Sequence, residues 1–347
     1  MTLEPTEEQA LLRDMVGRFL ADHVPQDAAG RGPMPTADWR ALGDLGVLAL
    51  AVPEAAGGLG GGPQEVAIVA EALGRVAAMT PMAECAVLCA VLIAEGGGGA
   101  PGPTWIEAVV SGRSIVAYAG QGEGLGDLRI TPSGEGWILD GERRLVRHGA
   151  QADAFVVACD DDVLLVEAGT PGVTIVPHRL ADGDPAAVVR FDGVEVAAAA
   201  RLSVSAARRR RTLALAKLAI AAEMVGLMQT LHEATVDHVR QRRQFGVPIG
   251  SFQVIQHRVA RLFISLEQSR SILLRAVFAD DEGFATAVTE AFAYIADAAL
   301  RLAQDATQLH GGMGVTEELL VGRGHRRLLV LSHLFGGAIA ARAELAS

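Results

Sequence analysis

Four long stretches near the C-terminus repeat apolar residues at helical spacing, and they constrain the fold more than any other feature. We expect helices over 213–241, 250–278, 285–309 and 327–346. Short polar breaks separate them, which is typical of antiparallel neighbours in a bundle. The chain is 50% hydrophobic but only 4% aromatic, so its core consists mainly of Ala, Val, Leu and Ile. The sequence therefore predicts a C-terminal four-helix bundle over residues 205–347.

Residues 111–204 have a different pattern, in which short β-rich runs alternate with turn residues. Examples of these runs are SIVAYAG, GWILDGERRLV, DAFVVAC and GVTIVPH. Asp140–Gly141 and Asp192–Gly193 are Asp-Gly pairs, which favour tight turns between strands, so we expect a turn at each. This segment is predicted to be a small antiparallel β domain.

Residues 1–110 show helical patterns interrupted by glycine-rich loops, which predicts an N-terminal helical domain. Thr6 is a candidate N-cap, and apolar residues follow it at helical spacing from Leu11 to Phe19. Further helices are expected over 38–44, 64–73 and 83–94. The stretch EGGGGAPG at 95–102 is expected to be a surface loop.

The charge balance limits the classes of partner. The formal net charge is −11 and the pI is near 5.3, which argues against a nucleic-acid partner because phosphate binding needs a basic face. Arg208–Arg211 is the local exception, and we interpret it as a solvated helix start or linker. The first residues lack the layout of a signal peptide. No apolar run free of charges and glycine is long enough to span a bilayer, so we predict a soluble, cytoplasmic protein without a membrane partner.

Three cysteines, Cys85, Cys89 and Cys159, are too few for a disulfide framework. Cys85 and Cys89 are four residues apart, so they share one face of a helix. No nearby histidine completes a metal site, and we expect both thiols to be buried structural residues. No metal site is predicted.

Two C-terminal segments carry a family resemblance. RQRRQFGVPIGSFQVIQHRVA at 240–260 and QLHGGMG at 308–314 resemble the flavin-adenine-binding half of the acyl-CoA dehydrogenases. TEEQALLRD, WRALGDLGVLALAVPEAAGGLG and DGERRLVRHGAQADAFVVA match further stretches of the family, so the resemblance covers nearly the whole chain. It implies an acyl-CoA dehydrogenase-like fold with an N-terminal α-helical domain, a middle β domain and a C-terminal four-helix bundle.

The resemblance also implies a flavin adenine dinucleotide (FAD) site that is shared across a subunit interface. In this family one chain holds the flavin ring with its β domain, and the neighbouring chain holds the adenine and pyrophosphate with its bundle. Arg242 matches the arginine that pairs with the pyrophosphate, a role that suits a guanidinium group. The other implied cofactor contacts are Gln244, Phe245, Ile249, Phe252, Gln308, Gly311 and Gly312.

The catalytic base of the family has no counterpart at either of its usual positions. The family's chemistry removes a proton α to the thioester, which needs a carboxylate. The usual position aligns with Phe335, and the alternative position aligns near Ala216. Glu223 lies two helical turns after Ala216 and is a candidate replacement for the base. We favour its interpretation as a charge on a helix face.

The positions that contact the flavin ring also depart from the family. The family's Thr-Glu-Pro-x-x-Gly-Ser-Asp loop corresponds here to AYAGQGEGLGD at 117–127, in which only Gly126–Asp127 matches. Gly337 and Ile339 replace a Thr and a Gln that touch the flavin. The adenine half of the site is therefore kept and the ring half is lost.

This half-site resembles the short, base-lacking subunit of actinobacterial α2β2 acyl-CoA dehydrogenases that act on steroid side chains. The resemblance implies a partner chain that carries the catalytic Glu, a bulky acyl-CoA substrate and an electron-transfer flavoprotein as acceptor. Apolar residues on several faces of LALAKLAIAAEMVGLM independently predict burial against another subunit. Two alternatives remain open. One is a self-sufficient homo-oligomeric flavoenzyme with an atypical base, and the other is a flavin-free scaffold or binding protein of the same fold.

Overall fold

The computed structural model describes residues 6–24, 32–97, 101–120 and 125–346. The chain forms two compact units. We call Met1–Gly32, Pro63–Ala78 and Lys217–Ser347 the helical unit, and Pro33–Gly62 and Met79–Ala216 the mixed unit. Helix α6 (Ala206–Gln241) begins in the mixed unit and ends in the helical unit. The three-domain division with boundaries at 110 and 204 stays a prediction.

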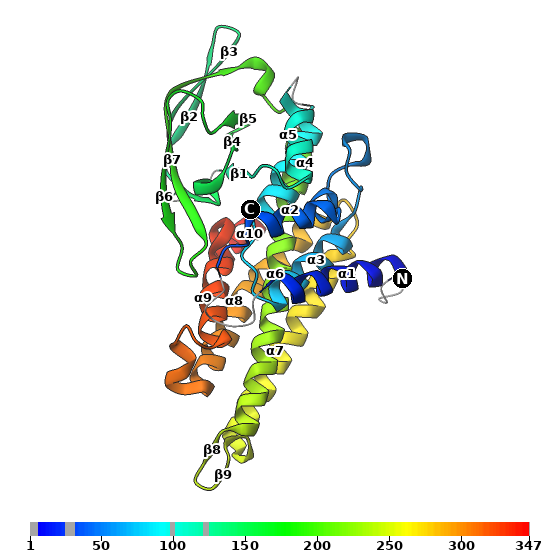
Figure 1. Cartoon of the computed structure of the whole chain (residues 1–347), viewed down its shortest axis with the longest axis vertical. Helices are drawn as coiled ribbons and strands as arrows, with labels where there is room; N and C mark the ends of the chain where they lie inside the picture. The colour runs from blue at the N-terminus through cyan, green and yellow to red at the C-terminus, as the bar shows by residue number, and fades with distance from the viewer. Residues whose placement is uncertain (1–5, 25–31, 98–100, 121–124, 347) are drawn as a thin grey trace. The chain divides into compact units, whose positions relative to one another are not determined.

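The helical unit contains the predicted bundle (Figure 1). Its helices are the C-terminal part of α6, α7 (Gln253–Val277), α8 (Phe284–His310), α9 (Leu320–His333) and α10 (Gly337–Ala346), together with α1 (Glu7–His23) and α3 (Pro63–Arg75). The expected cap is present, since the Thr6 side chain accepts a hydrogen bond from Gln9 N–H at 3.2 Å. The predicted helix over 327–346 is wrong as a single element. It is broken at η8 (Leu334–Gly336), where Phe335 has the left-handed angles φ 52° and ψ 29°.

Glycines allow α3 and α6 to pack closely inside the helical unit. A Cβ on Gly74 would lie 2.0 Å from the Glu223 carbonyl oxygen, and one on Gly226 would lie 2.1 Å from that of Glu71. Contacts this short admit only hydrogen at Cα. The apolar stretch around Glu223 is buried within the chain itself, so the prediction that it needs another subunit for burial is wrong.

The mixed unit begins with helices α2 (Thr36–Asp44), η1 (Val47–Ala49) and η2 (Glu54–Ala56). The helix predicted over 83–94 is a π-helix, η3 (Met82–Cys89), that continues as α4 (Ala90–Gly96). Helix α5 (Pro101–Val110) was not predicted from the sequence. Of the predicted loop at 95–102, residues 98–100 lie outside the described residues, and the last two residues already belong to α5.

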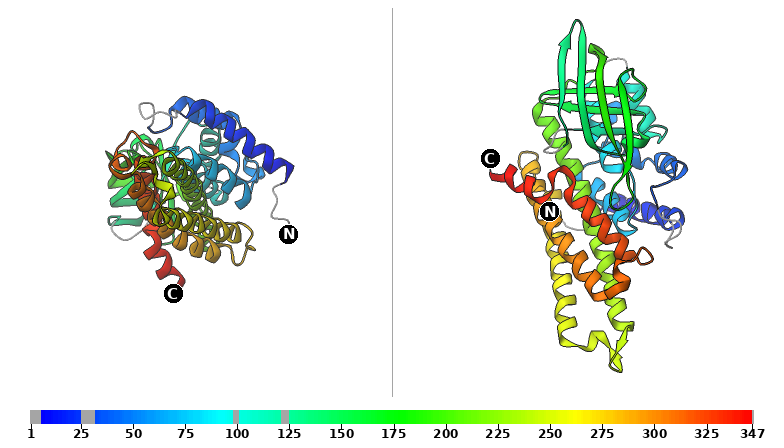
Figure 2. Two further views of the ribbon diagram at one scale, coloured as in Figure 1. Left: turned by 90° about the horizontal axis from the view of Figure 1, so that it is seen from below. Right: turned by 90° about the vertical axis from the view of Figure 1, so that its left-hand side faces the viewer.

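Two sheets complete the mixed unit (Figure 2). One has the order β1-β4-β5 and the other β2-β3-β7-β6. The strands are β1 (Val116–Ala119), β2 (Leu128–Ser133), β3 (Gly136–Arg147), β4 (Ala154–Cys159), β5 (Asp162–Glu167), β6 (Val173–Arg179) and β7 (Pro185–Ala197). Apolar residues of both sheets share one core that includes Phe155, Leu164 and Val189. The predicted β domain is present, with the difference that β1 pairs with β4 in parallel.

Both Asp-Gly pairs lie inside long strands, so the two turns predicted there are wrong. The pairing of β3 with β7 shifts register between Leu139 and Gly141. At this bulge the N–H of Gly193 donates to the Asp140 carboxylate at 2.9 Å. Gly141 and Gly193 have φ values of 120° and 56°. The Asp-Gly chemistry is therefore used to bend two paired strands.

Candidate functional site

The first part of the candidate site is the end of α6. Arg242 directly follows the helix, and its N–H donates to the carbonyl of His238 at 2.8 Å. Its own carbonyl accepts the N–H of Ile249 at 2.8 Å, which closes the hairpin of β8 (Arg243–Gln244) and β9 (Val247–Pro248). Arg242 is exposed, and its guanidinium has no hydrogen bond or ion pair with any described residue. The backbone is fixed while the charge remains available to a ligand.

The hairpin presents the predicted aromatic and amide contacts. Phe245 sits at its tip with φ 54° and is 92% exposed. Its ring meets that of Phe252 edge to face, with a centroid distance of 6.2 Å. Gln244 is exposed, and Ile249 is half-buried. An apolar ring this exposed on a fixed turn is typical of a residue that packs against a ligand or another chain.

The second part of the site is the end of α8. Gln308 is exposed in the last turn, and its carbonyl accepts the N–H of Gly311. Gly311 adopts φ 65° and ψ −145°, a conformation that is nearly confined to glycine. A Cβ on Gly311 or Gly312 would meet no atom within 4 Å. The turn therefore leaves its backbone open to close approach from outside.

A ring contact brings these two parts together, and the sequence did not predict it. His238 on α6 stacks on His310 at the end of α8, with centroids 4.2 Å apart and planes at 28°. Arg242 and the Gln308–Gly312 turn consequently lie at the same end of the bundle. The sequence carries no signal for this stack, because the two histidines belong to segments far apart in the chain.

Neither position of the family base holds a carboxylate in the structure. Phe335 is half-buried at the break between α9 and α10, and Ala216 is fully buried in α6. Beyond the break, Gly337 is buried and Ile339 is 81% exposed. An aromatic ring and a methyl group cannot accept a proton, so these positions supply no base.

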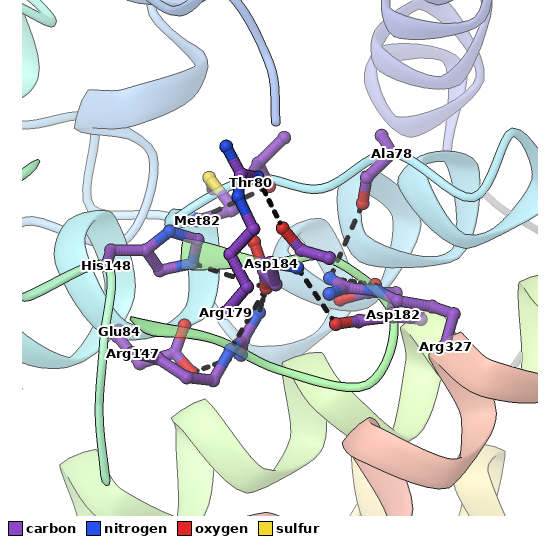
Figure 3. A network of polar contacts seen from close by, with 12 residues as sticks. Ala78, Thr80, Met82, Glu84, Arg147, His148, Arg179, Asp182, Asp184 and Arg327 are labelled. Carbon is purple, nitrogen blue, oxygen red and sulfur yellow. Dashed lines mark hydrogen bonds and ion pairs between the residues drawn. The ribbon is translucent and has the colours of Figure 1, made fainter. Parts of the chain in front are cut away.

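Glu223 is neutralised by a buried arginine that the sequence did not reveal. Arg327 on α9 donates to Glu223 Oε1 from Nε at 2.9 Å and from Nη2 at 2.7 Å. The two residues are 1% and 7% exposed, and Nη2 also lies 3.5 Å from the Ala78 carbonyl (Figure 3). Glu223 does lie on a helix face, as interpreted, but that face is buried inside the helical unit. The carboxylate is instead part of a buried ion pair.

The β-domain segment that corresponds to the ring-contacting loop is partly described. Residues 121–124 lie outside the described residues, while Gly126 and Asp127 line an open pocket of about 690 Å³. The other lining residues are Leu128, Arg129, Asp140, Gly141, Arg143, Cys159 and Asp160. Arg143 is buried, and it donates to the Gly126 carbonyl at 2.7 Å. The charged side chains of the wall have mixed signs, so the pocket shows no specific ligand chemistry.

A second buried ion cluster lies within the mixed unit (Figure 3). Arg147 forms ion pairs with Glu84 of η3 and with Asp184, and all three side chains are less than 10% exposed. Its Nη2 lies 2.7 Å from Asp184 Oδ2, and His148 Nε2 lies 3.8 Å from the same oxygen. Arg147 is a cation flanked by two carboxylates, so its charge is satisfied inside the protein.

The cysteines behave as structural residues. Burial raises the pKa of the Cys85 thiol to about 12 and that of Cys89 well above its ordinary value. Such thiols stay protonated at neutral pH and are poor nucleophiles and metal ligands. Among the described residues, no cluster of His, Cys, Asp and Glu is arranged to hold a metal ion. Arg208 and Arg209 of the four-arginine run form surface ion pairs with Glu95 and Asp161.

Two helical stretches of the described chain are long and apolar enough to cross a membrane. They are Ala206–Gln241 and Leu320–Ala346, and 78% and 39% of their apolar windows are buried inside the protein. A core helix of a folded domain passes the same test, so the signal is weak. The cytoplasmic location stays a prediction.

Sequence comparisons identify the type of chain to which this site belongs. Residues 206–343 match the family described as "Acyl-CoA dehydrogenase, C-terminal domain", and residues 6–113 match "Acyl-CoA dehydrogenase, N-terminal domain". The acyl-CoA dehydrogenase FadE27 of Mycobacterium tuberculosis is 33% identical over 301 residues, which cover 82% of this chain and 80% of that protein. FadE28 of the same organism is 30% identical over 342 residues, covering 97% and 96%.

Solved structures agree with these sequence matches. A chain of the ChsE4-ChsE5 complex from Mycobacterium tuberculosis superposes with a TM-score of 0.90 at 29% identity, covering 100% of this chain and 98% of that one. A chain of a variant of the Tcur3481-Tcur3483 steroid ACAD gives a TM-score of 0.87 at 29% identity, covering 98% and 97%.

Proposed function

This chain belongs to the acyl-CoA dehydrogenase family, and we propose that within it the chain is the non-catalytic subunit of a heteromeric FAD-dependent enzyme. It supplies the adenine and pyrophosphate half of a flavin site to a partner chain that carries the catalytic Glu. The assembly is an α2β2 tetramer, and the chain alone has no dehydrogenase activity.

One observation carries this proposal: an exposed arginine without a partner among the described residues lies at the end of the bundle, in a chain whose base positions are apolar. This arginine is Arg242, and Phe335 and Ala216 occupy the base positions. A cation suited to phosphate, at the same end of the bundle as an open glycine turn, favours a nucleotide-binding chain over a scaffold that binds none. A self-sufficient dehydrogenase needs a carboxylate, and Glu223 is held in an ion pair with Arg327.

The described residues at the bundle end fit the dinucleotide part of FAD. Arg242 supplies a donor fork for phosphate oxygens. Gln308 adds an amide, and the open backbone of Gly311 and Gly312 admits close approach. Phe245 and Phe252 offer apolar rings to the adenine. When bound, FAD supplies the hydride acceptor for the α,β-dehydrogenation of an acyl-CoA thioester, while the residues of this chain bind and orient the cofactor.

Two further observations support an assembly with an unlike partner. Helix α7 exposes the apolar side chains of Val254 by 65%, Phe263 by 51% and Ile264 by 54%, and exposed apolar side chains of this size favour packing against another chain. The ChsE4-ChsE5 complex and the Tcur3481-Tcur3483 steroid ACAD each have two named components. One chain of each structure is similar to this chain over nearly its full length. We therefore infer that the site is completed by a different chain.

The proposed substrate is a bulky acyl-CoA, with a steroid side-chain thioester as the leading example. This choice rests on the steroid enzyme among the similar structures. The electron-transfer flavoprotein is the proposed acceptor, as the family resemblance implies.

The test is reconstitution of activity. The chain is purified alone and after co-expression with a candidate partner, an acyl-CoA dehydrogenase-like chain that carries the catalytic Glu, and both preparations are assayed for acyl-CoA-dependent dye reduction. We expect no turnover from the chain alone and turnover from the pair. Turnover by the chain alone would support the self-sufficient enzyme, whereas failure of both to bind FAD would support the scaffold.

A further inference from the structure

The stacked rings of His238 and His310 join the two segments that supply the proposed half-site. His238 lies one helical turn before Arg242, and His310 directly precedes Gly311 at the end of α8. Their centroids are 4.2 Å apart. The contact shows that the end of α6 and the glycine turn lie at the same end of the bundle. The proposed dinucleotide half-site is placed there, so the inference rests on the proposed function.

The hydrogen bonds of the pair connect it to both ligand-binding elements. The His238 carbonyl accepts the N–H of Arg242 at 2.8 Å. His310 Nδ1 lies 2.9 Å from the Ala306 carbonyl, which can only accept, so Nδ1 carries the proton. A shift of either ring displaces a residue that faces the phosphates.

The charges around the pair disfavour a proton on His238 in the free chain. Burial lowers the pKa of His238, and the neighbouring His310 and Arg242 lower it further. On α8, Asp305 is held in an ion pair with Arg258 of α7, so neither charge is left uncompensated. On α9, the pKa of His325 is lowered by burial and by Arg326, and its Nδ1 lies 3.1 Å from Thr307 Oγ1. Among the described residues, no carboxylate forms a hydrogen bond with either stacked ring.

We propose that the His238–His310 stack is a proton-linked positioning element of the dinucleotide half-site. It holds Arg242 and the Gln308–Gly312 turn at fixed positions, and His238 takes up one proton when the phosphates of a dinucleotide bind beside Arg242.

The sign of the effect follows from linkage. A bound pyrophosphate offsets the positive charge of Arg242 and attracts an imidazolium, so it raises the pKa of His238. A group whose pKa rises on binding makes binding tighter at lower pH. The gain in FAD affinity is complete below the pKa of His238 in the free chain, which lies under the ordinary histidine value of 6.5. The gain is lost as the pH rises through the pKa of His238 in the FAD-bound chain. Within this window, uptake of one proton changes the Kd by at most about tenfold per pH unit.

The first experiment measures the Kd of FAD for the assembled complex by quenching of flavin fluorescence. The pH is varied between about 5 and 8, a range that spans the ordinary pKa of histidine. The pyrophosphate of FAD stays ionised over this range, so any dependence of the Kd on pH arises from groups of the protein. His238→Phe retains a ring for stacking but cannot titrate. We expect the Kd of this variant to change much less between high and low pH than the Kd of the wild type does, whatever its value at high pH.

His232→Phe is the matched control. His232 also lies on α6, its pKa is also lowered by burial, and its ring also meets an aromatic neighbour, Phe263, at 5.8 Å. It belongs to neither ligand-binding segment, so its removal should leave the pH dependence unchanged. If the pH dependence of the Kd for FAD is lost equally in His238→Phe and His232→Phe, the inference is overturned.

The second experiment needs no variant. Titration calorimetry of FAD into the wild-type apo-complex, in two buffers with different ionisation enthalpies, reports the number of protons taken up. We expect net uptake of up to one proton near the ordinary histidine pKa. Binding without proton uptake, or with the same pH dependence in His238→Phe, overturns the proton link and leaves the proposed function intact. No FAD binding at any pH overturns both.

Discussion

Two arginines of the helical unit show how different environments give one side chain different roles. Arg242 stands at the end of the bundle, exposed, with its backbone held by His238 and its guanidinium unpaired among the described residues. Arg327 lies inside the unit, 1% exposed, with two of its nitrogens on one oxygen of Glu223. The first cation is available to an external phosphate, and the second compensates an internal carboxylate. Because Glu223 is paired with Arg327, it is not a free carboxylate.

The same distinction applies to the mixed unit. Arg147 lies between Glu84 and Asp184 and is fully committed to them. Buried cations of this kind are costly to strip of their partners, but they are not ligand sites. In both units the buried ion pairs are structural features, and the exposed cation at the bundle end carries the proposed function.

The largest expected effect is on stability, at the buried arginine. Arg327→Ala leaves Glu223 buried without its partner and should lower the free energy of unfolding by about 3–5 kcal/mol. Denaturant unfolding measures the change. The double variant Glu223→Leu/Arg327→Met should recover most of the loss, because an apolar pair needs no compensation. A loss below about 1 kcal/mol, the typical value for an arbitrary substitution, would contradict the assignment of a buried pair.

The next effect is on binding, at the exposed arginine. Arg242→Ala should weaken FAD binding by the assembled complex about ten- to hundredfold, since a charge-assisted hydrogen bond contributes about 1.5–3 kcal/mol. Its free energy of unfolding should change by less than about 0.5 kcal/mol. Arg240→Ala changes an exposed neighbour in the last turn of α6 and is the control that should leave FAD content unchanged. Unchanged FAD content in Arg242→Ala would remove this residue from the site.

The glycine turn separates backbone strain from ligand contact. Gly311→Ala should destabilise the chain by about 1–3 kcal/mol because of its backbone angles. Gly312→Ala meets no atom within 4 Å, so its stability should stay within about 0.5 kcal/mol of the wild type. The second variant should nevertheless bind FAD more weakly if the cofactor approaches this backbone. Wild-type FAD affinity in Gly312→Ala would place the cofactor elsewhere.

The smallest expected effect concerns catalysis. Glu223→Gln retains a hydrogen bond to Arg327 and should leave the rate of the assembled complex within about twofold of the wild type, whereas loss of a general base costs about a hundredfold or more. Steady-state kinetics with saturating acyl-CoA makes the comparison. A hundredfold loss would identify Glu223 as the base and favour the self-sufficient enzyme.

Local pattern was enough to predict some features and not others. Helical spacing predicted the long helices of the bundle, because each buries a periodic apolar face. It did not reveal the break at Phe335, since a left-handed residue leaves the apolar pattern intact. The two Asp-Gly pairs predicted tight turns, but only the pairing of β3 with β7 decides between a turn and a bulge. The resemblance identified Arg242 and Gln308 as candidates, whereas the His238–His310 stack and the Glu223–Arg327 pair depend on tertiary contacts.

The most direct test of the proposed half-site is the visible absorbance spectrum of this chain, purified alone and again with the proposed partner chain. We expect a colourless chain and a yellow complex that contains one flavin per pair of unlike chains. A yellow chain alone, with one flavin per chain, would contradict the half-site and show that this chain completes a flavin site without an unlike partner.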